Sequence, residues 1–247
     1  MRIMGKAMAK AVGVDAEIVC GADQLCTGLK GGVEGAIHAV SGEFDSGGVE
    51  CAILEMKRPA EEGPQAWFAD DSAKRRGPLR GYHPNGKKSK LVVRAGCKER
   101  AREVFGDTDV EIVSGARYME GFVGTAEGKR AYATERVQEW QRCVNRMADA
   151  AAKYPQAAHT ALTTSLQAEW DFFMRVMPEE RATFEPLRDA LTHYLTQLSS
   201  HVVTATEVQL MMLPARHGGM GVRDPTERVA AAYETSTKGT SLLVSII

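Results

Sequence analysis

The stretch Trp67-Phe68-Ala69-Asp70-Asp71-Ser72 decides how the rest of the chain is interpreted. Its apolar part is typical of a buried strand, which places the two aspartates at the strand tip. Because successive strand side chains point to opposite faces, both carboxylates reach one site only if a tight turn follows. Two carboxylates at such a tip suit a pair of divalent cations and in-line phosphoryl displacement. A plain turn stays open as the alternative, because Asp and Ser side chains readily hydrogen-bond to their own backbone.

Length and composition are those of an ordinary globular protein. The chain has 247 residues, which allow one or two domains with a sizeable core. A formal net charge of -1 does not indicate a nucleic-acid binder, so any basic surface must be local. The five cysteines are widely spaced and form no C-x-x-C pair, which argues against disulfides and zinc. We therefore expect an intracellular protein of the nucleus or cytoplasm, not a secreted one. No apolar run approaches the length that spans a membrane.

The first half of the chain alternates short helices and strands. The glycine-rich run 23–32 lacks the residue order of a phosphate-binding loop, so we interpret it as a turn entering a helix. His38 stands alone on the apolar face of that helix and is expected to pack in the core. The expected helices are 2–12, 33–40 and 97–104, the expected strands are 50–56, 65–69, 90–94, 110–113 and 119–124, and a polar turn is expected over 41–49. For residues 1–14, a mitochondrial presequence is the less favoured alternative to a surface helix.

Near Thr125 the pattern changes to apolar residues spaced by three and four, which is typical of amphipathic helices. Pro155 is expected in the first turn of a helix, and Thr204 with Glu207 matches the capping-box spacing. Residues 213–222 contain three glycines and are expected to form a compact loop. The expected helices are 131–152, 158–176, one that starts at 177–180 and runs to about 198 with an interruption at Pro186, 204–212, and a short one from Pro225.

A local basic block follows the aspartate pair. Its members are Lys74, Arg75, Arg76, Arg80, Lys87, Lys88, Lys90 and Arg94. A solvated charged face is one interpretation. Contact with phosphate groups is the other, because lysine and arginine neutralise the charge of a nucleotide or a nucleic-acid backbone.

Four separated stretches occur in one order, and each resembles a motif of reverse transcriptases. Phe-Ala-Asp-Asp at 68–71 resembles the catalytic Y/F-x-D-D motif, and Asn-Gly-Lys-Lys-Ser at 85–89 is similar to the N-x-x-K-S/T motif that follows it. Residues 121–125 are similar to the palm strand that grips the primer. Residues 213–222 closely resemble the L-P-x-R-x-G-G-L-G-I stretch that ends many retrotransposon polymerases. Residues 2–6 and 24–39 look like the start of the same domain. Each motif is weak alone, and their shared order identifies the chain as similar to reverse transcriptases of non-LTR retrotransposons.

This resemblance implies an α+β fold, with a partial right-hand polymerase palm in residues 1–128 and a helical thumb in 129–247. It implies RNA-directed DNA synthesis from an RNA template, a DNA primer and dNTPs, with Mg²⁺ or Mn²⁺ as the cation. Asp70 and Asp71 would bind the cations, and Lys88 would sit near the leaving pyrophosphate, with a solvated lysine as the open alternative. The residues expected to contact nucleic acid are Lys74, Arg75, Arg76, Lys87, Lys90, Gly121 and Gly124.

The sequence departs from the family pattern at positions that catalysis needs. The family has a third carboxylate on an earlier palm strand, and Met56 occupies the matching position here. Glu55 is adjacent but would face the other side of the strand. The segment that shapes the nucleotide pocket and the helix after the aspartate pair are also missing, because 61–65 and 72–78 are too short to replace them. We therefore predict a degenerate or misassembled polymerase fragment of the nucleotidyltransferase lineage that is catalytically defective. A non-enzymatic nucleic-acid-binding remnant and an unrelated helical interaction protein are the alternatives.

Overall fold

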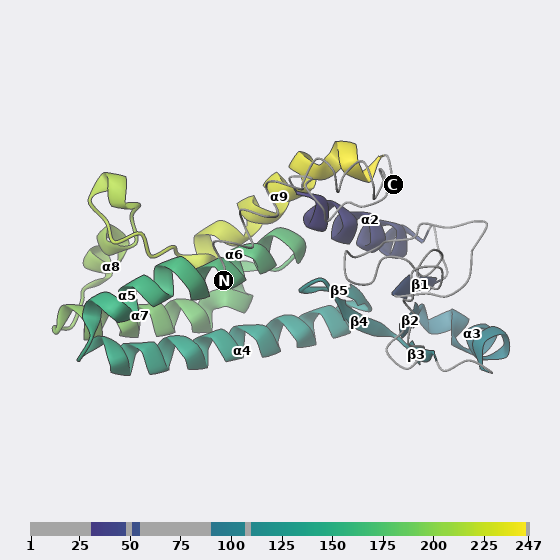
Figure 1. Cartoon of the computed structure of the whole chain (residues 1–247), viewed down its shortest axis with the longest axis horizontal. Helices are drawn as coiled ribbons and strands as arrows, with labels where there is room; N and C mark the ends of the chain where they lie inside the picture. Colours follow the sequence, from purple (N-terminus) through teal and green to yellow (C-terminus); the bar gives the residue numbers. More distant parts are fainter. Residues whose placement is uncertain (1–30, 48–50, 55–89, 107–109, 246–247) are drawn as a thin grey trace, which may run out of the picture. The chain divides into compact units, whose positions relative to one another are not determined.

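The structure is a computed structural model, and it describes residues 31–47, 51–54, 90–106 and 110–245. In this part of the chain, helices predominate and short strands form two small sheets (Figure 1), so the expected α+β class is confirmed. The helix expected at 2–12 and the strand expected at 65–69 lie outside the described residues. Among the helices that the structure describes, none is both long and apolar enough to cross a membrane.

The chain forms two compact units. Of the residues that the structure describes, the first unit comprises those up to Lys129 together with those from Thr237 onward, and the second unit is Arg130–Ser236. Two helices, α4 (Ala126–Ala151) and α9 (Pro225–Val244), each contribute residues to both units.

The larger sheet of the first unit has three strands in the order β1 (Cys51–Leu54), β2 (Lys90–Val93) and β3 (Glu111–Val113). β1 pairs antiparallel with β2, whereas β2 pairs parallel with β3. A parallel pair needs a crossover connection, and α3 (Lys98–Phe105) supplies it. The core of this sheet consists of Leu91, Val93 and Ala101, with Phe105, Val110 and Ile112 packed against them.

The smaller sheet is a hairpin of β4 (Gly115–Tyr118) and β5 (Gly121–Gly124). The sequence predicted a single strand over 119–124, and it missed β4. Met119 and Glu120 instead form the connecting turn, with φ values of 51° and 70°. Positive φ at both central residues is the geometry of a two-residue hairpin turn, which normally favours Gly or Asn. Neither residue type is present, so the local sequence gave no signal for this turn.

Helix α2 (Gly32–Ser46) packs in the first unit and is longer than the predicted 33–40. The prediction of a polar turn from Ser41 is wrong, because the helix passes through Gly42 and buries Phe44, which is 5% exposed. Burial of a large aromatic side chain outweighs the small helix penalty of one glycine. His38 is buried, as expected for a packed histidine.

The second unit is helical. Its elements are α4, α5 (Pro155–Ala161), a π-turn at Leu162–Leu166, α6 (Gln167–Val176), a 3₁₀ turn at Arg181–Phe184, α7 (Glu185–Ser199), α8 (Ala205–Met211), a 3₁₀ turn at Ala215–His217 and the start of α9. The predicted first-turn position of Pro155 is confirmed. The predicted helix start at 177–180 is wrong, because α7 begins at Glu185 and Pro186 lies in its first turn rather than interrupting it. Helix α9 is longer than the short final helix that the sequence predicted.

An aromatic cluster forms the core of the second unit. Trp140 of α4 lies edge-on to Trp170 and Phe173 of α6, with ring centroids 6.2 Å and 5.3 Å apart, and Phe184 follows at 6.4 Å from Phe173. Tyr194 of α7 is fully buried, and this burial raises the pKa of its hydroxyl to about 12. The cluster fixes the packing of the helices that carry it.

The loop that follows α8 is held by a buried amide. Gln167 is 1% exposed; its Nε2 donates to the Gly221 carbonyl oxygen at 3.2 Å, and its Oε1 accepts from the Arg223 amide at 2.8 Å. Arg223 also pairs with Asp171 of α6. The compact loop predicted over 213–222 is confirmed, and its backbone is anchored to α6.

The predicted capping box is confirmed at α8. The Thr204 hydroxyl accepts from the Glu207 amide at 3.3 Å, and the Thr204 amide donates to Glu207 Oε2 at 2.7 Å. These bonds to Thr204, its backbone amide first and its hydroxyl second, hold the pKa of the Glu207 carboxyl below its usual value of 4.5.

We expect Thr204→Val to raise the pKa of Glu207 toward 4.5, because the hydroxyl bond is lost and the cap geometry loosens. A carboxyl with a lowered folded-state pKa stabilises the fold above the unfolded pKa, and this contribution disappears as pH falls through the folded pKa. The cap should therefore be fully formed at neutral pH and lost in acid. An NMR pH titration of Glu207 checks this, with the exposed Thr206→Val as control. A Glu207 pKa that is the same in the unmodified chain and in Thr204→Val would contradict it.

Candidate functional site

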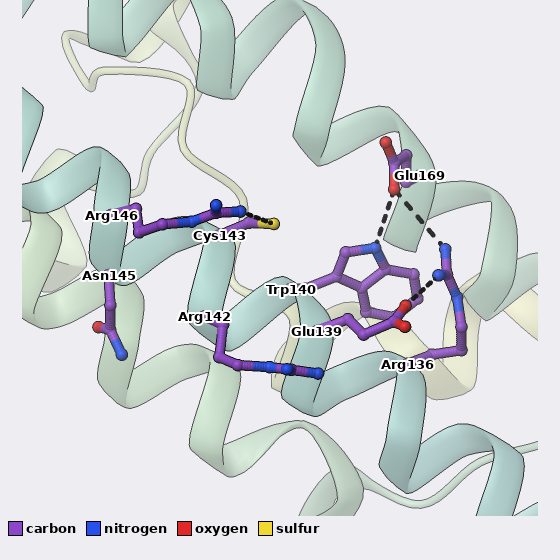
Figure 2. Close-up of a pocket in the computed structure, with 8 residues that line it drawn as sticks. All are labelled: Arg136, Glu139, Trp140, Arg142, Cys143, Asn145, Arg146 and Glu169. Carbon is purple, nitrogen blue, oxygen red and sulfur yellow. Dashed lines mark hydrogen bonds and ion pairs between the residues drawn. The ribbon is translucent and has the colours of Figure 1, made fainter.

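A pocket of about 680 Å³ opens on the second unit, between α4 and α6 (Figure 2). It is rich in charged side chains. Its lining residues are Arg136, Glu139, Trp140, Arg142, Cys143, Asn145, Arg146 and Glu169. All of them except Glu169 come from α4, where Arg136, Trp140 and Cys143 follow one another at spacings of four and three residues on one side of the helix.

Arg136 organises the carboxylates of the pocket. It pairs with Glu139 one turn along α4, and its Nη2 lies 3.7 Å from Glu169 Oε2 of α6. The same Glu169 oxygen accepts the Trp140 indole N–H at 3.1 Å, and the Arg136 guanidinium stacks over the Trp140 ring at 4.9 Å. Both pocket carboxylates are therefore engaged by groups of the protein itself.

Arg142 and Arg146 are exposed and have different partners. Arg142 Nε donates to the Gln138 carbonyl oxygen at 3.3 Å, and Arg146 Nη2 contacts Cys143 Sγ at 3.3 Å. Within the described ranges, neither guanidinium makes an ion pair with a carboxylate. The lining thus carries three arginines against two glutamates, and the excess positive charge lies at Arg142 and Arg146. Such a site is suited to bind an oxyanion.

No cation site accompanies this pocket in the part of the chain that the structure describes, where no group of three or more His, Cys, Asp or Glu side chains could hold a metal ion. The residues expected to bind a catalytic cation, Asp70 and Asp71, lie outside the described ranges. Their role, and that of Mg²⁺ or Mn²⁺, stays a prediction.

Three residues that the sequence singled out for nucleic-acid contact lie in the first unit. Lys90 begins β2, is exposed, and its Nζ lies 3.4 Å from Glu111 Oε2 on the paired strand. Gly121 and Gly124 lie in the hairpin, where added Cβ atoms would fall 3.1 Å from Ile37 Cγ2 and 2.3 Å from Gly115 Cα, respectively. Both glycines thus lie close to other parts of this chain, and their contact with nucleic acid stays a prediction. Lys74, Arg75, Arg76, Lys87 and Lys88 lie outside the described residues.

The sequence alone did not predict the pocket between α4 and α6. The pair Arg142 and Arg146 stands four residues apart within a predicted helix, which was the available signal. Glu169, however, lies on another helix, and nothing in the local pattern indicates that it and Arg136 meet.

Comparisons with protein-family models, curated proteins and solved structures find no match to this chain.

Proposed function

We propose that the chain is a fragment of a reverse transcriptase of the retrotransposon kind, with a partial palm and a thumb, that has lost most nucleotidyl-transfer activity. The observation that carries this proposal is the order of four motifs along the sequence, at 68–71, 85–89, 121–125 and 213–222. The proposed partners are an RNA template, a DNA primer and dNTPs.

The local structure at two of these motifs is compatible with the proposal. Residues 121–124 form the second strand of a tight hairpin, and α4 begins at Ala126, two residues later. This matches a primer-gripping strand that leads directly into a helical thumb. Residues 213–222 fold as a compact loop that is tied to α6 through Gln167.

The donor set of this chain does not fit a complete two-metal site. Asp70 and Asp71 supply two carboxylates, but the third position holds Met56. Mg²⁺ and Mn²⁺ prefer oxygen ligands, and a thioether is a poor substitute. We therefore assign no catalytic step to the aspartate pair and expect a defective enzyme.

Primer extension tests the proposal. With an RNA template, a DNA primer, dNTPs and Mg²⁺ or Mn²⁺, we expect the full chain to give no extension above the protein-free level, because a cation ligand is missing. Binding to an RNA–DNA duplex should persist and weaken as salt is raised.

Two results would count against this function. Extension that disappears in Asp70→Ala but persists in the exposed control Asp189→Ala would overturn the claim of lost activity. No duplex binding at low salt would overturn the proposed nucleic-acid partners.

A further inference from the structure

We propose that Arg142 and Arg146 form a binding site for phosphate groups in the pocket between α4 and α6. This site goes beyond the proposed function, because it needs neither the aspartate pair nor a polymerase palm. It rests on side chains of the second unit alone.

The spacing of the two arginines favours joint contact with an anion. Residues four apart on a helix lie on the same face, with a rise of about 6 Å along the axis. Each guanidinium has five N–H donors in a planar fork, and the internal contacts of Arg142 and Arg146 each use one of them.

Among the described residues, the two carboxylates of the pocket pair with Arg136 and not with Arg142 or Arg146. Glu139 and Glu169 both lie within ion-pair distance of Arg136, and Glu169 also accepts from Trp140. Figure 2 shows Glu139, Glu169 and Arg136 grouped around Trp140, with the Arg146 guanidinium at Cys143 and outside that group. An oxyanion bound to Arg142 and Arg146 would therefore meet donors without competing against an internal ion pair.

The size of the pocket indicates a ligand larger than one phosphate ion. A volume of about 680 Å³ lies within the range of sites for small organic ligands. Two sources share the required chemistry: a soluble polyphosphate, as in a nucleotide, and the backbone of a single-stranded nucleic acid.

Two probes separate these sources in the full chain. One is a fluorescein-labelled oligothymidine of about 15 nucleotides, followed by fluorescence anisotropy at several salt concentrations. The other is inorganic tripolyphosphate, followed by titration calorimetry. The test variant is Arg142→Gln/Arg146→Gln. The matched control is Lys153→Gln/Arg175→Gln, which removes the same charge from exposed positions of the second unit outside the pocket lining.

We expect the test variant to lose about tenfold or more in affinity for the probe that binds, and the control to change little. If the source is a nucleic-acid strand, the slope of log affinity against log salt should also fall by about 1.4, because two phosphate contacts are lost. Arg142→Lys/Arg146→Lys should retain part of the affinity, since the charge remains and the planar fork is lost.

Binding of the oligonucleotide assigns the site to a strand, and binding of tripolyphosphate alone assigns it to a soluble phosphate ligand. Either supports the proposal when the test variant is selectively weakened. An equal loss in the control would overturn it, and so would failure of both probes to bind. If the test variant binds both probes as tightly as the unmodified chain does, this site is overturned, and the persisting oligonucleotide binding leaves the proposed function standing. Circular dichroism verifies that each variant keeps the helical content of the unmodified chain.

Discussion

Replacing Phe173 with alanine is expected to lower the free energy of unfolding by about 4 kcal/mol. Phe173 is 2% exposed and is the hub of the aromatic cluster. Its ring lies 5.9 Å from Tyr132, 5.3 Å from Trp140 and 6.4 Å from Phe184. Truncation would leave a cavity between α4, α6 and the 3₁₀ turn before α7, and the ring contacts would be lost as well. Urea denaturation followed by circular dichroism measures the change.

Phe172 offers a matched control on the same helix. It precedes Phe173, is only half-buried, and stacks with the exposed Arg175 at 5.4 Å. Phe172→Ala removes the same atoms and should cost no more than about 1 kcal/mol. Equal losses in the two variants would show that α6 does not present Phe173 to the core as described.

Gly124→Ala is expected to lower the stability of the first unit by about 3 kcal/mol, through backbone strain and steric clash. The φ of Gly124 is +146°, a conformation that residues with a Cβ rarely adopt. An added Cβ would also lie 2.3 Å from Gly115 Cα and 2.6 Å from the Ser114 carbonyl oxygen. Both contacts are with backbone, so no side-chain rotation can relieve them. Amide hydrogen exchange of the β4–β5 hairpin measures the effect.

The same substitution at Gly42 should act in the opposite direction. Gly42 lies in the interior of α2, and an added Cβ there would meet nothing within 4 Å. Gly42→Ala should therefore stabilise the first unit by about 0.5–1 kcal/mol, because alanine favours the helix and restricts the unfolded chain. A destabilised Gly42→Ala variant would contradict the helix that continues past Ser41.

The sequence was most informative where one local interaction determines the structure. Thr204 and Glu207 bond within one helical turn, so their spacing alone specified the start of α8. Pro155 likewise marked a helix start, because its fixed φ suits the first turn. The strands at β1, β2 and β3 followed from short β-branched and apolar runs.

The sequence was misleading where distant contacts outweigh local preference. Gly42 signals a break, yet α2 continues because Phe44 gains burial further along the helix. Strand β4 begins only one residue after β3 ends, and it contains the charged Arg117. The sequence therefore shows no separate run of alternating apolar residues that would predict β4 as a strand of its own. The pocket between α4 and α6 also depends on contacts between residues that are far apart in the sequence. Arg136 and Glu169 meet only because α4 and α6 pack together through the aromatic cluster. The aspartate pair lies outside the described residues, so its predicted role stays untested.

The division of the chain has a consequence for how it assembles during synthesis. Thr240 and Leu243 of α9 belong to the first unit, where they lie against the backbone of Gly31 and Gly35 at the start of α2. They follow the whole of the second unit in the sequence. A ribosome therefore completes residues 130–236 before it releases the segment that covers this end of α2. The first unit, although most of it is made first, therefore cannot reach its final packing before the second unit has been synthesised.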